Sequence, residues 1–301
     1  MKKGWIYLLL CTLVTPGCIN SNENSGPRYS TSPGVPEVPV FSFAVHPLHN
    51  PNKLLQVYQP LIDYLNVNVT GARFTIGASR DYASYEKKYL DRKPGFLLPN
   101  PWQTIQAMKV GYHVLAMAGE PGDFKGIFVV RKDGGIRSPS DLKGKVISYP
   151  ASTALAACIM PQYFLHSAGI NVSTGIINKY VGSQESSIMN VYLGQSVAGA
   201  TWPPPWRAFQ KDHPKEAAAL MVIWETEPLI NNSVMVRDDV PVEIMLQVQK
   251  LLTTLNEKVE GKPILSDMET SRFILATDKD YDIVGSYITR FENEVRKIET
   301  K

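Results

Sequence analysis

Two small hydroxyl residues lie where a predicted strand ends and a predicted helix begins. The segment YPASTALAAC, residues 149–158, places Ser152 and Thr153 directly before a run of helix-forming residues. A helix N-terminus has unpaired N–H groups and a partial positive charge, so it binds anions readily. A cap at Ser152 or Thr153, with the N–H groups of Thr153, Ala154 and Leu155, predicts a site for a tetrahedral oxyanion. The same residues also suit an ordinary helix cap, so the segment alone leaves both interpretations open.

Strand-like and helix-like segments alternate along the chain after residue 39. The expected strands are 40–45, 73–76, 95–98, 112–117, 126–130, 145–148, 175–181, 197–201, 221–224 and 233–236. The expected helices are 52–65, 82–90, 102–110, 153–167, 185–193, 242–259, 268–275 and 281–297. Repeated β–α units predict mainly parallel sheets, because parallel strands need helical crossovers. About ten strands are too many for one comfortable sheet, so we expect an α/β protein with two lobes.

The first residues are typical of an exported protein. A short basic start precedes an apolar run at 5–14, which is too short to span a bilayer and predicts a signal peptide at 1–17. The residues before Cys18 resemble a bacterial lipoprotein cleavage site, although Thr15 stands where that pattern prefers leucine. We therefore expect acylation of Cys18, with plain signal-peptide cleavage nearby as the alternative. The polar segment 18–39 is expected to be a flexible tether.

Composition and cysteine content exclude several classes of function. A formal net charge of +3 over 301 residues, without a Lys/Arg run, argues against nucleic-acid binding. Cys158 has no disulfide partner outside the amino-terminal segment, and its apolar neighbours indicate core packing rather than catalysis. His46 and His49 lie close in sequence, but nothing nearby completes a metal site. No nucleotide-binding, hydrolase or metalloprotease motif is present, so we expect neither an enzyme nor a bound cofactor.

Several segments, in sequence order, resemble the phosphate/phosphite/phosphonate-binding proteins of ABC importers. They are VYQPLIDYL (57–65), FLLPNPW (96–102), the stretch from GDFKG to HSAGIN (122–171), GSQESSIMNVYLGQSVAGA (182–200), VRDDVP (236–241) and ATDKDYDIV (276–284). The resemblance covers residues 40–290. It implies a type II periplasmic-binding-protein fold, in which two α/β lobes joined by two crossovers close on the ligand. The first lobe would be 40–124 plus 232–301, and the second 125–231.

The resemblance also implies roles for particular residues. Ser152 and Thr153 match the family's oxyanion-binding pair, while Ala154 replaces its third hydroxyl and keeps only a backbone N–H. Trp102 stands in place of an aromatic donor, and its indole N–H donates one hydrogen bond. Glu185 matches a carboxylate that accepts a proton from the ligand, which favours protonated phosphorus oxyanions over sulfate. A solvated first-turn glutamate is the alternative for Glu185.

Three further residues are predicted to border the ligand. Tyr149 directly precedes the cap, and it either walls the site or packs in the sheet. Trp202 stands near the place where aminophosphonate binders carry an acidic residue, and it either contacts an apolar substituent or packs the lobe. Because Trp202 cannot neutralise an amine, we expect phosphate, phosphite or methylphosphonate rather than 2-aminoethylphosphonate. His46 lies on a loop that could face the cleft and donate to the ligand.

The resemblance implies an extracytoplasmic protein that captures a phosphorus oxyanion for an ABC importer. Its expected partners are the small anion, an ABC permease and the membrane, which it would reach through the lipid anchor, and nucleic acid is not among them. We expect a monomer in the periplasm or cell envelope. The alternatives are a ligand sensor of the same fold for a membrane kinase or envelope complex, and a binder of a different small ligand in an altered pocket.

Overall fold

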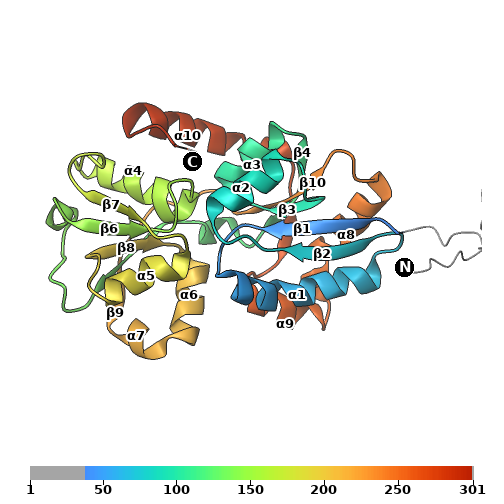
Figure 1. Cartoon of the computed structure of the whole chain (residues 1–301), viewed down its shortest axis with the longest axis horizontal. Coiled ribbons are helices and arrows are strands. Elements are labelled where there is room, and N and C mark those ends of the chain that lie inside the picture. Colours follow the sequence, from blue (N-terminus) through green and yellow to red (C-terminus); the bar gives the residue numbers. More distant parts are fainter. Residues whose placement is uncertain (1–37, 300–301) are drawn as a thin grey trace, which may run out of the picture. The chain divides into compact units, whose positions relative to one another are not determined.

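The computed structural model describes residues 38–299, which belong to one compact unit. The predicted signal peptide at 1–17 and the predicted lipidation site, Cys18, lie outside the described residues, as does nearly all of the predicted tether at 18–39. The described residues contain two β-sheets flanked by helices, so the fold is α/β as predicted (Figure 1).

Sheet A has the strand order β11-β4-β10-β3-β1-β2. Its strands are β1 (Val40–Val45), β2 (Arg73–Gly77), β3 (Phe96–Leu98), β4 (Tyr112–Ala118), β10 (Ser233–Arg237) and β11 (Phe273–Leu275). The helices that pack around it are α1 (Pro51–Asn68), α2 (Tyr82–Leu90), α3 (Pro101–Met108), α8 (Val242–Thr253) and α9 (Gly261–Asp267). We call this sheet with these helices half A.

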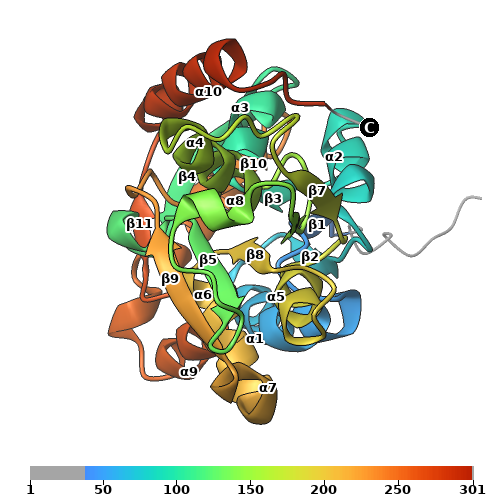
Figure 2. The ribbon, with the colours of Figure 1, turned by 90° about the vertical axis from the view of Figure 1, so that its left-hand side faces the viewer.

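Sheet B has the strand order β7-β6-β8-β5-β9 and faces the viewer in Figure 2. Its strands are β5 (Ile127–Arg131), β6 (Val146–Tyr149), β7 (Ile177–Tyr180), β8 (Ala198–Thr201) and β9 (Leu220–Glu225). Its helical elements are the π-helical turn Leu155–Ile159, α4 (Met160–Ser167), α5 (Gln184–Tyr192), α6 (Pro203–Asp212) and α7 (Pro214–Ala218). We call this group half B.

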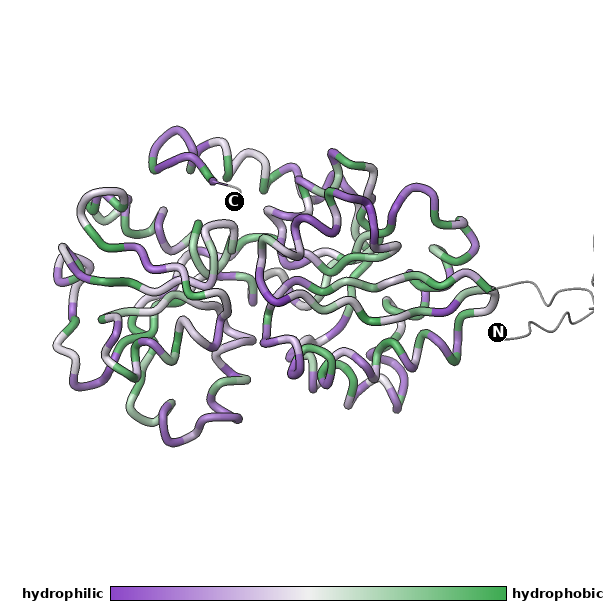
Figure 3. Tube along the Cα trace, viewed as in Figure 1, coloured by the Kyte–Doolittle hydropathy of each residue, from purple (hydrophilic) through white to green (hydrophobic). Residues whose placement is uncertain are grey.

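Apolar strands build the core of each half, whereas polar residues concentrate on the outer helices (Figure 3). In sheet A the rings of Phe43 and Phe96 stack at 6.1 Å, and both side chains are fully buried. Each such burial contributes about 1.5–3 kcal/mol to folding. The buried face of α1 includes Leu54, Leu61 and Leu65, which recur at helical spacing. Packing of this kind fixes the helices whose ends border the cleft.

The chain passes from half A to half B between β4 and β5, and it returns between β9 and β10. The two passages are tied together, since Thr226 N–H donates to Gly126 O at 2.8 Å and Leu229 N–H donates to Phe124 O at 2.8 Å. Their positions agree with the two crossovers that the sequence predicts. The exact limits of two moving lobes stay a prediction.

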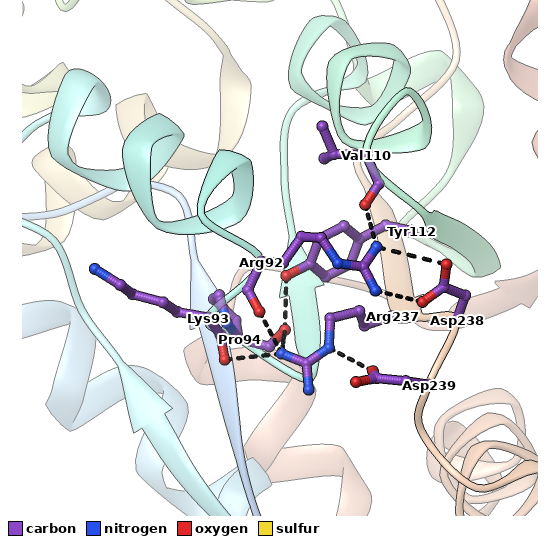
Figure 4. A network of polar contacts seen from close by, with 8 residues as sticks. All are labelled: Arg92, Lys93, Pro94, Val110, Tyr112, Arg237, Asp238 and Asp239. Atoms are coloured by element: carbon purple, nitrogen blue, oxygen red, sulfur yellow. Dashed lines mark hydrogen bonds and ion pairs between the residues drawn. The ribbon is translucent and has the colours of Figure 1, made fainter.

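A polar network closes the end of sheet A that lies far from half B (Figure 4). Arg92 pairs with Asp238 at 2.5 Å, and Tyr112 Oη donates to Pro94 O at 2.7 Å. Arg237 donates to the backbone carbonyls of Arg92 and Lys93. These bonds join the loop before β3 to the end of β10 and so hold the register of the sheet.

The helix α10 (Asp282–Glu294) and the segment after it reach both halves. The helix packs against α3, while Tyr163 Oη on α4 donates to Glu294 at 2.9 Å. Beyond the helix, Arg296 Nε donates to Gln162 Oε1 at 2.7 Å. The carboxyl-terminal segment therefore crosses to half B and comes close to the residues that the sequence singles out.

Several predicted elements are confirmed, and the differences have physical reasons. The strand at 40–45 and the helix at 82–90 have the predicted limits. The predicted helix at 268–275 is wrong, because the helix in this region is Gly261–Asp267 and Phe273–Leu275 pairs with β4 as strand β11. Both sheets are mixed rather than mainly parallel, since β10 and β5 each return antiparallel to their neighbours.

The helix α6 (Pro203–Asp212) is absent from the predicted elements because its first three residues are prolines, which are also typical of loops. Pro203, Pro204 and Pro205 occupy its first turn, after Trp202 as the N-cap. The N–H groups of a first helical turn have no intrahelical acceptor, so proline costs little there. The helix predicted to start at 153 begins instead with the π-helical turn at Leu155.

Candidate functional site

A small cavity lies between residues of half A and residues of half B. Its volume is about 190 Å³, counting its mouth. It is lined by His46, Tyr82, Asn100, Phe124, Ala154, Leu155, Ala156, Ala157, Gln184, Trp202 and Asn232. None of these residues is an Asp, Glu, Lys or Arg. The cavity therefore has polar groups that point to a polar ligand, but no formal charge to meet one.

The π-helical turn brings free backbone donors to this cavity. Ala154, the N-cap, donates its own N–H to Ala151 O at 3.3 Å, and the first bond of the turn runs from Ile159 N–H to Ala154 O at 3.1 Å. Among the described residues, no acceptor is recorded for the N–H groups of Leu155–Cys158. A π-helical bond skips one more residue than an α-helical bond, so one extra N–H is left free.

A glycine permits the close packing behind this turn. A Cβ added to Gly126 would lie 2.5 Å from Ala156 O, which is closer than any real contact. The crossover strand can therefore pass directly behind the turn only with glycine at this position. This packing fixes the backbone of Ala156 at the wall of the cavity.

His46 contributes a lone pair to the cavity. Its Nδ1 lies 2.9 Å from Leu98 O, and a carbonyl oxygen only accepts, so Nδ1 carries the hydrogen. Burial lowers the pKa of His46 to about 4, which leaves the ring neutral at physiological pH. Its Nε2 is therefore an acceptor rather than the donor that the sequence predicts. The only hydrogen bond of the His46 ring within the described residues is the one at Nδ1, so Nε2 has no partner there.

The side-chain oxygen of Asn232 has no hydrogen-bond partner within residues 38–299. The residue is 3% exposed, it lines the cavity, and its Oδ1 is buried without a hydrogen bond among the described residues. A buried polar atom left unpaired costs about 1–3 kcal/mol. Such a group in a cavity indicates a bound partner, which is either water or a ligand.

The other amides of the cavity are oriented by bonds within the protein. Asn100 Nδ2 donates to Thr153 O at 3.2 Å, and its Oδ1 caps α3. Gln184 Nε2 donates to Tyr82 Oη at 3.2 Å, while Thr201 donates to Gln184 Oε1 at 2.9 Å. Because Tyr82 Oη accepts from Gln184, its own hydrogen is free to donate to a ligand. The bonds Asn100–Thr153 and Gln184–Tyr82 join half A to half B.

The predicted pair Ser152 and Thr153 has its hydroxyl hydrogens on protein acceptors. Ser152 Oγ donates to Glu299 O at 3.1 Å, and Thr153 Oγ1 donates to Glu86 Oε1 at 2.6 Å. Both residues line a separate cavity of about 600 Å³, counting its mouth, together with Asp81 and Glu86. Glu86 is 5% exposed, and burial raises its pKa although Thr153 and Gln103 donate to it.

The remaining predicted site residues divide between the cavity and the core. Trp202 lines the cavity and packs against Phe124 at a ring distance of 5.4 Å. Tyr149 is fully buried in the core of half B, and Trp102 is 3% exposed in the core of half A. Glu185 accepts from His213 Nε2 at 3.2 Å and from Asn50 at 3.5 Å, and it lies outside the cavity lining.

Trp202 and Asn232 also line a third cavity of about 490 Å³, counting its mouth, which is distinct from the one beside Ser152 and Thr153. Apolar residues such as Leu48, Tyr58 and Met268 border it, together with Asp123 and Glu269. On α6, Arg207 pairs with Glu269 at 2.9 Å, so this carboxylate is already neutralised. The two cavities therefore share Trp202 and Asn232 as lining residues.

Sequence reasoning missed four polar residues of the smaller cavity, which are Tyr82, Asn100, Gln184 and Asn232. Two of them lie in segments that resemble the family, since Asn100 belongs to FLLPNPW and Gln184 directly precedes Glu185. Asn232 directly precedes the predicted strand at 233–236. An amide beside the end of a buried strand is the signal that identifies such a residue.

Two general features of the described residues bear on the class of site. In this part of the chain no helix is long and apolar enough to cross a membrane. No group of three or more His, Cys, Asp or Glu side chains in residues 38–299 is arranged to hold a metal ion.

The sequence and the fold can be compared with those of known proteins. The chain is 26% identical over 196 residues to a probable ABC transporter phosphite-binding protein of Prochlorococcus marinus (strain MIT 9301), and the match covers 61% of this chain and 66% of that protein. The chain thus spans just under two thirds of that relative's length.

Solved structures share the fold at low sequence identity. A binding-protein component of an ABC phosphonate transporter from Pseudomonas aeruginosa has a TM-score of 0.79 at 16% identity, covering 86% of this chain and 88% of that one. A Prochlorococcus marinus protein in complex with methylphosphonate has a TM-score of 0.77 at 20% identity, covering 85% and 99%. Both likenesses confirm the fold that the sequence predicts.

The family itself is shown by a match along most of the chain. A family model described as "ABC transporter, phosphonate, periplasmic substrate-binding protein" matches residues 43–281, which include both sheets except the start of β1. All residues that line the small cavity lie inside the match. The chain belongs to the family of periplasmic substrate-binding proteins of ABC phosphonate transporters.

Proposed function

We propose that this protein captures a phosphorus oxyanion, namely phosphate, phosphite or a phosphonate, in the small cavity and delivers it to an ABC permease. The observation that carries the proposal is the row of free N–H groups at Leu155–Ala157 in the same cavity as the unpartnered amide of Asn232. Neutral donors held in place by the fold bind an anion without a cation, because the anion's charge is spread over several hydrogen bonds.

The class of ligand follows from the size of the cavity and from the relatives. The cavity is small, which argues against a bulky ligand. One relative is named for phosphite, and one structural neighbour was solved with methylphosphonate. Both are small tetrahedral phosphorus anions, and we assign the same class to this cavity. We propose that the ligand is captured and released unchanged, as suits a substrate-binding protein of a transporter.

The protein works outside the cytoplasm, as its family does, and we propose that a lipid on Cys18 anchors it as a monomer to the membrane. Residues 18–39 would give the binding domain reach from the bilayer. Incorporation of a labelled fatty acid tests this: Cys18→Ser should abolish labelling and release the protein from the membrane fraction. A labelled Cys18→Ser protein would place the anchor elsewhere.

Calorimetric titration of the purified protein tests the ligand. The panel is phosphate, phosphite, methylphosphonate, 2-aminoethylphosphonate and sulfate. We expect tight binding of at least one of the first three, with 2-aminoethylphosphonate and sulfate much weaker. No binding of any phosphorus anion would overturn the proposal.

A backbone substitution tests the role of the free donors. Ala156→Pro removes one N–H in a first helical turn, where proline is tolerated, whereas the control Ala156→Ser keeps that N–H. A hydrogen bond to a charged group is worth about 1.5–3 kcal/mol, so Ala156→Pro should weaken binding about 10- to 150-fold. Equal affinity of the two variants would show that the anion binds elsewhere.

A further inference from the structure

The small cavity presents acceptors as well as donors, which an ordinary anion site does not need. His46 Nε2 carries a lone pair because Nδ1–H is fixed on Leu98 O at 2.9 Å. Asn232 Oδ1 is buried without a partner among the described residues. Both residues line the cavity. A fully ionised oxyanion has only acceptor oxygens, so it would face His46 Nε2 with lone pair against lone pair, whereas the Asn232 amide can turn its NH₂ to a ligand oxygen.

The charge of the lining limits the charge of the ligand. Within the described residues, no Lys or Arg lines the cavity. The free N–H groups of the π-helical turn and the partial positive charge of the helix end, about half an elementary charge, favour a singly charged anion over a doubly charged one. A second buried negative charge would need a cation, which this lining does not offer.

We propose that the cavity binds its oxyanion in the singly charged, singly protonated form, with the ligand's P–OH hydrogen donated to His46 Nε2 and with the Asn232 amide turned so that its NH₂ donates to a ligand oxygen. This inference rests on the proposed function, because it concerns the same cavity and the same ligands. Phosphorus oxyanions release their second proton near neutral pH, at about pH 6 for a phosphate monoester. Sulfate and sulfonates carry no such proton near neutral pH, and the site rejects them for that reason.

The groups that face His46 leave this assignment intact. From α2 the rings of Tyr82 and Tyr85 meet His46 edge-on at 6.2 and 6.4 Å, and burial raises the pKa of both phenols. His49, on the same loop as His46, has a pKa lowered by burial to about 4 and is neutral too. Glu86, one turn beyond Tyr82, is held by Thr153 and Gln103 and lines the other cavity.

Proton counting during ligand binding tests the proposal. Methylphosphonate is titrated into the purified protein between pH 5.5 and 9.5, in pairs of buffers that differ in protonation enthalpy. Above the second pKa of the ligand, we expect Kd to rise about tenfold per pH unit, with uptake of one proton per ligand bound. Methanesulfonate has the same shape and a single charge but no hydrogen on its oxygen atoms, and it should bind at least about a hundredfold more weakly than methylphosphonate.

Substitutions locate the acceptor. His46→Gln replaces the lone pair with an amide that can turn its NH₂ to the ligand. The rise of Kd for methylphosphonate with pH should therefore become smaller than tenfold per unit, and methanesulfonate should bind more tightly than it does to the unaltered protein. The matched control is His113→Gln, at an exposed histidine outside the cavity lining. If His46→Gln does not fold, the proton count of the unaltered protein decides alone.

The outcomes separate this inference from the proposed function. Methylphosphonate that stays equally tight up to pH 9.5, without proton uptake, would overturn the inference and leave the proposed function standing. Methanesulfonate as tight as methylphosphonate would do the same. A lack of binding by every phosphorus anion at every pH would overturn both.

Discussion

Thr153→Val should weaken ligand binding without removing any contact to the ligand. Thr153 belongs to half B and Glu86 to half A, and the bond between Thr153 Oγ1 and Glu86 Oε1 is 2.6 Å long. The two residues are 3% and 5% exposed, so water does not replace the lost donor. If the two lobes open and close around the ligand, as the resemblance to the family implies, we expect this bond to be lost on opening.

The size of the effect follows from the chemistry of the bond. A hydrogen bond to a charged group contributes about 1.5–3 kcal/mol, and Gln103 still donates to the same oxygen at 3.1 Å. If the bond is lost only on opening, Kd should rise about 10- to 150-fold. Thr153→Ser keeps the hydroxyl and should change Kd by less than about threefold.

A double-mutant cycle distinguishes this bond from direct contact with the ligand, which is the role that the sequence predicts for Thr153. Titration at pH 8 gives Kd for Thr153→Val, Glu86→Ala and the double variant. A bond between the two side chains predicts that Thr153→Val costs little once Glu86 is removed. If the two losses simply add, Thr153 acts on the ligand directly and the bond to Glu86 does not hold the closed form.

Three further outcomes are expected. Burial raises the pKa of Glu86 above its ordinary 4.5, so the folded protein loses stability as the pH rises and this carboxyl ionises. The variant Glu86→Gln should therefore melt at a higher temperature than the unaltered protein at pH 8, and this difference in melting temperature should vanish below about pH 4.5. Lys53 and Asp212 form an ion pair of 3.0 Å between the halves, and their side chains are 31% and 43% exposed. Because exposed ion pairs contribute little, Lys53→Glu should weaken ligand binding by at most about fivefold, and the exchange Lys53→Glu/Asp212→Lys should restore it. In 0.5 M salt the three proteins should have equal affinities. Cys158 is fully buried and its pKa is raised to about 12, so a thiol reagent should label it only after denaturation, as mass spectrometry can show.

The fold could be predicted where local signals agree with one another. The limits of α2 were predictable because Asp81 is a strong N-cap, accepting from Ser84 N–H at 2.8 Å, and an apolar face follows. The strand β11 was not predictable, since its three residues form a strand only because β4 offers them an edge. The start of α6 was hidden because proline suits a first turn as well as a loop.

The candidate site could be predicted as a place but not as a set of contacts. His46, Ala154 and Trp202 were identified, and all three line the cavity. The acceptor of Thr153 lies 67 residues away on another sheet's helix, and no local pattern carries that information. The role of His46 as an acceptor depends on Leu98 O, which is equally remote in the sequence.

Charge and selectivity are separated in this structure. Ion pairs such as Lys53–Asp212 and Arg207–Glu269 lie outside the small cavity, where they join α6 to half A. The cavity itself holds only neutral donors and acceptors. Exposed pairs contribute little energy each and weaken in salt, so they set how readily the halves close. Buried neutral groups are costly when unmatched, so they set which ligand is bound. Substitution at the ion pairs should therefore change the affinities for all ligands by the same factor. Substitution at His46 or Asn232 should instead change which ligand binds most tightly.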